Sequence, residues 1–333
     1  MDNPNQIDQK VKNNPLLPKI IQEISQAQEG TFKRRELIEK FEIESKKKDR
    51  KEHKLIVYIA RMGHPRNANP INPDDIAPIG SILQSFSGTE VIDLIIHSPG
   101  GDGNTAEKIV DMCRSYLPTK GQFNVIVPNK AKSAATLIAL GSNKIIMGYS
   151  SELGPIDAQI PVNVSGIVQY ISAQSFIDAK NDLVKKTHEA IDNKKPYQAY
   201  LQLLTTIDVA FVEECERAMN FARNVGSRFL SKYMLENMKN KIKREDLASK
   251  IAGTLSSAET YLSHGRMITA KDISAHEDLK KLKIEYLDQK NDLWNIIWEI
   301  YMRSEVFLSI NPNPQQTKAK LFESADSSLI TTG

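Results

Sequence analysis

The amino-acid sequence predicts an α/β fold in which helices connect the strands of a parallel sheet. Residues 91–96 form an almost uninterrupted apolar run, which is typical of a strand buried on both faces of such a sheet. Apolar runs at 123–127 and 144–148 predict two more strands, and helices are expected at 103–116 and 133–141. Strands and helices that alternate in this way indicate right-handed parallel crossovers.

The rest of this core, expected over residues 51–170, follows the same pattern. The first strand is predicted at 55–60, and a loop rich in glycine, proline and asparagine follows it. Residues 74–83 are then expected to form a helix that begins at two aspartates. A short strand or hairpin is predicted at 162–168.

Helical segments are expected on both sides of the core. Residues 1–50 are predicted to be a helical N-terminal arm, in which apolar spacing at 16–27 indicates one helix and Thr31 is placed to cap a second. Residues 171–310 are expected to form a helical C-terminal extension, and residues 311–333 a flexible tail. Helical spacing within the extension occurs at 174–192, 197–237, 244–253 and 290–306.

The composition is that of an ordinary folded protein, since 40% of the 333 residues are hydrophobic and 26% are charged. A net charge of +3 indicates no preference for nucleic acid. Cys113 and Cys215 are far apart, and no group of cysteine and histidine has the spacing of metal ligands. The polar N-terminus and the lack of a long apolar run predict a cytoplasmic protein without a membrane span.

Two segments carry residues that are suited to acyl transfer. Gly100 and Gly101 follow the strand at 91–97, and Ser133 stands where the next strand leads into a helix of small residues. Both positions lie at the carboxyl ends of parallel strands, where ligands bind in such sheets. A serine hydroxyl there can attack a carbonyl carbon, while the N–H groups of Gly100, Gly101 and Ala134 hold the oxygen that becomes negative.

Each of these residues also has a plain structural interpretation. Serine is common before a helix, so Ser133 can simply be an N-cap. Gly100 and Gly101 can simply turn the chain at the end of the strand. Such a turn needs only one glycine with positive φ, however, and the second glycine keeps side chains away from an approaching carbonyl.

The sequence from about residue 55 to 160 resembles the Clp-protease/crotonase superfamily. It is most similar to the serine dehydrogenase proteinase branch, which is related to signal peptide peptidase A. Three segments carry the resemblance: Ser-Pro-Gly-Gly at 98–101, Ser133 in Lys-Ser-Ala-Ala-Thr, and Leu-Gly-Pro-Ile-Asp at 153–157. The resemblance implies a Clp-like fold, a serine peptidase with Ser133 as nucleophile, and an oxyanion hole at the two glycines. It also implies a peptide or protein substrate, a homo-oligomer, and no metal or nucleotide cofactor.

The general base is left open by the sequence. Clp proteases use a histidine soon after the nucleophile, and this chain has none in the corresponding region. Signal peptide peptidases use a lysine further downstream, where this chain has Lys180, Lys185 and Lys186. A lysine base must be desolvated to lower its pKa toward neutrality. Lys180 and Lys185 both follow apolar residues in the sequence, so partial burial is expected for either of them. We favour Lys185, although each lysine also fits a solvated surface position.

Three further residues are candidates for roles in the site. His264 is a second candidate base, because the related family often has a histidine before its last helical region. His97 precedes the two glycines and can reach the site, and Asp157 can orient a base or pair with a lysine. Each of them also fits a structural role, as a buried histidine or a turn carboxylate.

Three other functions fit parts of the sequence. Residues 101–106 match G-x-G-x-x-A, a dinucleotide-binding fingerprint, but the next strand ends without the acidic residue that would bind a ribose. A crotonase-like acyl-CoA enzyme would use paired N–H groups without needing Ser133. A catalytically inactive scaffold of the same fold would need no base.

Overall fold

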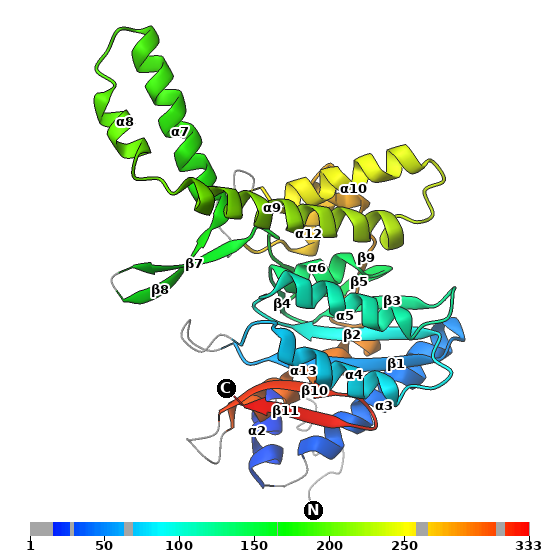
Figure 1. Cartoon of the computed structure of the whole chain (residues 1–333). Coiled ribbons are helices and arrows are strands. Elements are labelled where there is room, and N and C mark those ends of the chain that lie inside the picture. The colour runs from blue at the N-terminus through cyan, green and yellow to red at the C-terminus, as the bar shows by residue number, and fades with distance from the viewer. Residues whose placement is uncertain are drawn as a thin grey trace, which may run out of the picture.

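A computed structural model describes residues 16–26, 30–62, 69–164, 166–257, 266–310 and 317–332. Its centre is a seven-stranded sheet in the order β11-β10-β1-β2-β3-β5-β9 (Figure 1). The strands are β1 (His53–Ala60), β2 (Val91–His97), β3 (Gln122–Val127), β5 (Lys144–Met147), β9 (Ile284–Tyr286), β10 (Lys318–Glu323) and β11 (Ser328–Thr332). Within this sheet the neighbouring strands among β1, β2, β3, β5 and β9 are parallel. Strand β10 is antiparallel to both of its neighbours, β1 and β11.

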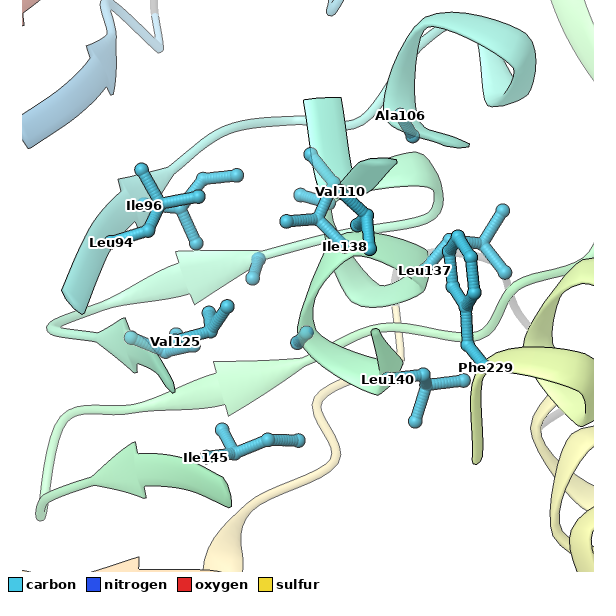
Figure 2. Close-up of a cluster of buried hydrophobic side chains, with 14 of the residues drawn as sticks. Leu94, Ile96, Ala106, Val110, Val125, Leu137, Ile138, Leu140, Ile145 and Phe229 are labelled. Atoms are coloured by element: carbon cyan, nitrogen blue, oxygen red, sulfur yellow. The ribbon is translucent and has the colours of Figure 1, made fainter. Parts of the chain in front are cut away.

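Helices cover both faces of this sheet. One face carries α4 (Ile76–Gln84), α5 (Gly103–Ser115), α6 (Ala134–Leu140), α9 (Val209–Phe229) and α10 (Lys241–Leu255). Ile96, Val110, Leu137 and Phe229 belong to the apolar cluster that these helices form with the strands (Figure 2). The other face carries α3 (Gly30–Asp49) and α13 (Asp292–Ser309), which bury a second apolar cluster against the sheet, and α2 (Leu16–Gln26) packs against α13.

Two hairpins extend from this body (Figure 1). One consists of β7 (Gln159–Val164) and β8 (Ile167–Ser172), and the other of α7 (Ala173–Asp192) and α8 (Gln198–Leu204). No residue of α8 is buried. The remaining short elements are η2 (Pro73–Asp75), β4 (Lys130–Ala131), β6 (Glu152–Leu153), the π-helical η3 (Leu230–Met234), α12 (Ala270–Ala275) and η4 (Leu279–Lys281).

Most of the predicted elements are confirmed. The four predicted strands of the core correspond to β1, β2, β3 and β5, and the helices between them to α5 and α6. The predicted hairpin is β7–β8, and the two helices of the N-terminal arm are α2 and α3. The cap predicted at Thr31 is wrong, because α3 begins at Gly30 and Thr31 lies inside the helix. The α/β fold with a parallel sheet and crossover helices is therefore the observed one.

The single helix predicted at 197–237 is wrong, because the chain breaks it twice. The first helix, α8, ends at Leu204, and α9 begins after Asp208, whose carboxylate accepts a hydrogen bond from Phe211 N at 3.1 Å. This cap satisfies a backbone donor that a continuous helix would have bonded itself. After Phe229 the helix changes to π-helical geometry.

The flexible tail predicted at 311–333 is also wrong for the residues that the structure describes there. Strands β10 and β11 extend the main sheet beyond β1. Phe322 is buried and stacks on Tyr58 with 4.8 Å between ring centroids. Glu323 forms a buried ion pair with Arg34 at 2.6 Å. The C-terminal strands are thus part of the core.

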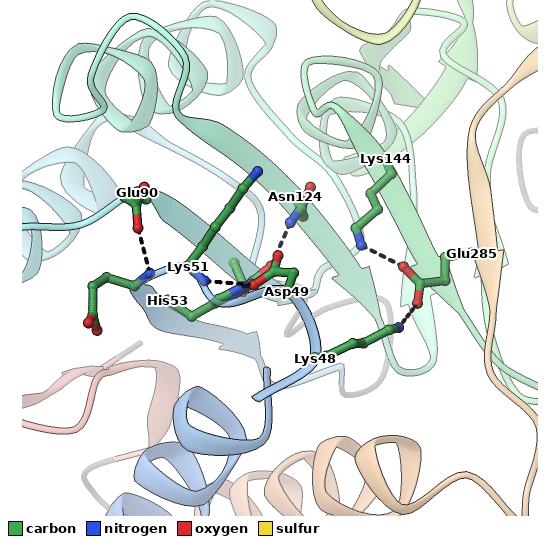
Figure 3. A network of polar contacts seen from close by, with 10 residues as sticks. Lys48, Asp49, Lys51, His53, Glu90, Asn124, Lys144 and Glu285 are labelled. Atoms are coloured by element: carbon green, nitrogen blue, oxygen red, sulfur yellow. Dashed lines mark hydrogen bonds and ion pairs between the residues drawn. The ribbon is translucent and has the colours of Figure 1, made fainter. Parts of the chain in front are cut away.

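Buried polar groups gather at the amino ends of the parallel strands (Figure 3). His53 Nδ1 lies 2.5 Å from Asp93 Oδ2, and Asn124 donates to Asp93 Oδ1 at 2.9 Å. Burial lowers the pKa of His53, but the bonds and charges of Asp93 and Asp49 outweigh it and hold the pKa above its usual value. This network stabilises the end of the sheet opposite the carboxyl ends.

Candidate active site

The carboxyl ends of β2 and β3 are joined by backbone hydrogen bonds beyond the sheet itself. Ser98 N donates to Lys130 O at 3.0 Å, and Lys132 N donates to Ser98 O at 3.1 Å. These bonds place the chain that follows β2 directly beside the chain that leads into α6. The two segments that the sequence singled out for acyl transfer therefore meet.

The turn formed by Gly100 and Gly101, here called the glycine turn, requires both glycines. Gly100 has a φ of +98°, and a Cβ there would lie 2.7 Å from both Lys132 O and Ser133 Cβ. Gly101 has a φ of +142°, and a Cβ there would lie 2.3 Å from Ile71 O. Only a backbone without side chains can pack so closely against Ser133.

Ser133 has a backbone conformation that is uncommon for a residue with a side chain, with φ +48° and ψ −116°. Such a conformation costs about 1–3 kcal/mol and is common at functional sites. The Ser133 side chain makes no capping hydrogen bond to α6. Ser133 therefore occupies the N-cap position without the side-chain hydrogen bond that the capping interpretation requires.

The backbone N–H groups of the glycine turn and of Ala134 differ in whether they already have a hydrogen-bond partner. Of the three N–H groups expected to form the oxyanion hole, that of Gly100 donates to Ser98 Oγ at 3.1 Å. Within the part of the chain that the structure describes, the N–H groups of Gly101 and Ala134 donate to no protein acceptor. Two of the three expected donors thus stay available for a ligand.

Ser133 lines a cleft of about 460 Å³. Its walls come from the N-terminal ends of α5 and α6, from the chain that enters β7, and from α9. Leu137, Ile156 and Phe221 give the cleft an apolar side. The four ionisable residues that line it are Asp102, Asp157, Glu214 and Arg217. Concave sites with apolar walls and a few polar groups are typical of ligand-binding sites.

The third sequence motif, at 153–157, holds α6 and closes the cleft. Thr136 Oγ1 on α6 lies 2.7 Å from Ala131 O and 3.0 Å from Gly154 O, and these two carbonyl oxygens share its one hydroxyl proton. Ile156 and Asp157 both line the cleft, and Asp157 is 3% exposed. Asp157 thus lines the same cleft as Ser133, and its expected role in orienting a base or pairing with a lysine stays a prediction.

The candidate lysines stand on α7, outside the residues that line the cleft. The Lys185 side chain is 74% exposed, so the partial burial expected for it is not found. Lys180 is 31% exposed and pairs with Glu216 on α9 at 3.1 Å. Among the described lining residues there is no lysine or histidine. His264 lies outside the described residues.

His97 does not reach the cleft. It is 2% exposed, its Nδ1 accepts a hydrogen bond from Lys130 N at 3.2 Å, and its ring packs edge-on against Tyr301 on α13. Burial, together with the charge of Lys130, lowers the pKa of His97 to about 3. His97 is therefore the buried, hydrogen-bonded histidine of the alternative interpretation.

Lys132, next to Ser133, is not among the residues that line the cleft. Its ammonium group lies 3.0 Å from Glu152 Oε1 and donates to Arg266 O at 3.1 Å. Burial lowers the pKa of Lys132, while Glu152 opposes that shift. This lysine anchors the chain that leads into Ser133.

The described residues bear on the expectations about metals and membranes. They contain no group of three or more acidic, histidine or cysteine side chains that could hold a metal ion. Nor do the described helices include one that has both the length and the apolar character to cross a bilayer.

Comparison with known proteins gives both sequence relatives and structural likenesses. Two uncharacterised proteins of Methanocaldococcus jannaschii, MJ0137 and MJ1495, are 45% and 42% identical over 90 and 69 residues. These segments make up 27% and 21% of this chain but span only 30% and 23% of the relatives' lengths.

The solved structures that are similar to this chain include three peptidases. A membrane-bound stomatin-specific protease has 16% identity and a TM-score of 0.33, covering 70% of this chain and 98% of its own. A peptidase from Plasmodium falciparum has 15% identity and a TM-score of 0.36, covering 71% and 96%. ClpP1 from Listeria monocytogenes has 12% identity and a TM-score of 0.31, covering 72% and 94%.

A larger part of the chain matches a known protein family. Residues 33–274 match the family described as ClpP-like SDH-type serine proteinase. The match covers well over half of the chain and includes the glycine turn, Ser133 and the third motif. This chain is therefore a member of the ClpP-like SDH-type serine proteinase family.

Proposed function

We propose that this protein is a serine peptidase that cleaves peptide bonds through an acyl-enzyme on Ser133. The observation that carries the proposal is the strained, uncapped Ser133 beside the glycine turn at the edge of a cleft. The Ser133 oxygen attacks the substrate carbonyl carbon and loses its proton to a base. The leaving amine takes a proton as the C–N bond breaks, and water then hydrolyses the acyl ester.

The negative oxygen of the intermediate is held by backbone N–H groups. Gly101 and Ala134 are the proposed donors, because the Gly100 N–H is already used by Ser98. The N-terminal end of α6 favours negative charge at the same place. Removing one such donor typically costs a factor of about 10²–10³ in rate.

The proposed base is a lysine, and Lys180 is now a better candidate than Lys185. Lys180 is the less exposed of the two, and its partner Glu216 belongs to α9, the helix that also lines the cleft. His264 stays a candidate base on sequence grounds. Single alanine substitutions of Lys180, Lys185 and His264 test the three separately, since loss of the base should reduce turnover by about 10²–10⁴.

A homo-oligomer, proposed from the family resemblance, is supported by the exposed arm of α7 and α8. Ile191, Leu201 and Leu203 on this arm are 43–50% exposed. Exposed apolar patches of this kind often mark interfaces. Light scattering coupled to size exclusion measures the mass directly, and a monomer at micromolar concentration contradicts this part of the proposal.

An inactive scaffold is the second candidate, because the described lining residues include no lysine or histidine. Hydrolysis of a fluorogenic peptide library separates the two. A peptidase is expected to cleave library members, to lose that activity in Ser133→Ala, and to keep it in Ser150→Ala, a matched change at a serine that bonds Pro128 O away from the cleft. Cleavage that persists in Ser133→Ala contradicts the proposal, and no cleavage by the wild type favours the scaffold.

A further inference from the structure

The ammonium group of Lys132 is buried and has a full set of acceptors, although no step of the proposed chemistry uses it. Its Nζ lies 3.0 Å from Glu152 Oε1. It also donates to Leu153 O at 3.3 Å and to Arg266 O at 3.1 Å. An ammonium group has three protons, so these three acceptors satisfy all of them. They belong to β6 and to the chain that precedes α12, so the Lys132 side chain joins the segment before Ser133 to two other parts of the fold.

The third motif leaves room for this side chain at its glycine. A Cβ on Gly154 would lie 2.6 Å from Lys132 Cδ and 3.2 Å from Lys132 Cα. A residue with a side chain at position 154 would therefore displace the lysine stem. The backbone holds the same two segments together, because Gly154 N donates to Ala131 O at 3.0 Å. Gly154 thus provides the space through which Lys132 reaches its acceptors.

The main chain of Lys132 is fixed by the segment after β2 and by α6. Its N–H donates to Ser98 O at 3.1 Å, and its carbonyl oxygen accepts from Ala135 N at 2.8 Å. The same oxygen is in close contact with the glycine turn, since a Cβ on Gly100 would lie 2.7 Å from it. Lys132 therefore contacts the glycine turn through its backbone and the third motif through its side chain.

Ser133, the next residue, needs support from its neighbours. Its φ of +48° and ψ of −116° cost free energy, and a residue keeps such a conformation only when its surroundings over-determine it. On the C-terminal side α6 supplies this constraint, because Leu137 N donates to Ser133 O at 3.1 Å. On the N-terminal side the adjoining residue is Lys132, held at both its main chain and its side chain. Displacements of about 1 Å in a catalytic site can cost a factor of about 10² in rate.

We infer that Lys132 is a positioning residue, whose buried ammonium group holds Ser133 in its strained conformation beside the glycine turn. This inference rests on the proposed function, because it assigns Lys132 to the placement of the nucleophile. Lys132 is not the base in this scheme, since three acceptors enclose its ammonium group and it does not line the cleft. Glu152 acts through Lys132, as the charged partner of the ammonium group.

The test uses a fluorophosphonate, whose phosphoryl oxygen occupies an oxyanion hole when it reacts with a nucleophilic serine. Lys132→Met keeps an apolar stem and removes the ammonium group. It is expected to lower the maximal rate of phosphonylation about a hundredfold and to leave the half-saturating reagent concentration unchanged, because residue 132 does not line the cleft. Arg303→Met is the matched control: it also removes a buried cation from an ion pair, with Glu299 on α13, and is expected to react like the wild type.

A double-mutant cycle separates positioning from general loosening of the fold. Glu152→Gln removes the negative charge but keeps an oxygen acceptor, and it is expected to react about tenfold slower than the wild type. If Glu152 acts through Lys132, the variant with both substitutions reacts about a hundredfold slower, rather than about a thousandfold. Rates are measured at a temperature where circular dichroism shows every variant to be folded. Lys132→Met is also expected to keep the rise in rate with pH that deprotonation of the base produces.

Each contrary result has a definite meaning. A wild-type rate in folded Lys132→Met, equal slowing of Arg303→Met, or effects that multiply in the double variant overturn the inference. A pH profile of Lys132→Met that no longer rises overturns it as well, because Lys132 would then be the base. Where Lys132→Met does not fold, a wild-type rate in Glu152→Gln overturns the inference. A wild-type protein that does not react at all overturns the proposed function instead.

Discussion

Replacing Gly100 by alanine tests the contact between the glycine turn and the nucleophile. The added Cβ would lie 2.7 Å from two atoms and 3.2 Å from a third, all in residues 132–134. Overpacking of this kind costs about 1–3 kcal/mol. A side chain at positive φ adds about 1–2 kcal/mol. Gly100→Ala is therefore expected to lower the free energy of unfolding by about 2–5 kcal/mol.

Gly88→Ala is the matched control. Gly88 also has a positive φ, +65°, but a Cβ there would meet nothing within 4 Å. The control carries the backbone strain without the steric clash, so the difference between the variants isolates the clash, about 1–3 kcal/mol. Unfolding entropy scales with chain length, so each kcal/mol corresponds to about 1.4 °C in a chain of this size.

Differential scanning calorimetry and phosphonylation rates are the assays. Gly100→Ala is expected to unfold about 1.5–4 °C below Gly88→Ala. It is also expected to react with the fluorophosphonate about a hundredfold more slowly than the wild type, because relief of the clash displaces the Gly101 donor. Equal unfolding temperatures for the two variants, or wild-type reactivity of Gly100→Ala, would refute the close contact on which this reasoning depends.

Three further outcomes follow from buried or capping groups. Burial raises the pKa of Glu305 to about 7, so the folded chain keeps a proton that the unfolded chain releases above about 4.5. The stability this contributes is present below pH 4.5 and is lost as the pH rises to 7, by about 2–3 kcal/mol. Glu305→Gln is expected to flatten the urea-unfolding profile between pH 5 and 8, and a profile parallel to the wild type contradicts this. Cys113 is wholly buried, and burial raises the pKa of its thiol to about 12. Iodoacetamide is therefore expected to modify Cys113 only in urea. Mass spectrometry of the native protein checks this, and rapid labelling of the native protein would contradict it. Asp208→Ala removes the cap bond to Phe211 N and is expected to lower the unfolding midpoint by about 1–2 °C, and an unchanged midpoint would show that the cap contributes nothing.

The strands of the core could be predicted because burial on both faces leaves a strong local signal. Residues 91–97 are buried throughout, and the predicted strand matches β2. The C-terminal strands could not be predicted in the same way. In β10 the buried residues include Lys320 and Glu323, which pair with Asp75 and Arg34, far away in the sequence. A local pattern cannot reveal such distant partners.

The candidate site, too, could be predicted from the sequence only in part. Ser133 and the glycine turn were predicted to meet because both follow parallel strands, and the structure brings them together. The hydrogen bond that occupies the Gly100 N–H could not be foreseen, since it depends on the side-chain conformation of Ser98.

The partial burial predicted for Lys185 is wrong. The sequence around Lys185 shows the spacing of a helix, but it does not show what that helix packs against. Apolar neighbours suggested a desolvated lysine, yet α7 extends from the body and leaves the side chain 74% exposed (Figure 1). Lys180, nearer the start of the same helix, contacts α9 instead.

Peptide mapping of the phosphonylated protein tests the central claim most directly. If Ser133 is an activated nucleophile facing an oxyanion hole, mass spectrometry will find one phosphonate per chain, on the tryptic peptide that contains Ser133, and none in Ser133→Ala. An adduct on a different serine, or an unmodified wild-type protein that is folded, would contradict the account.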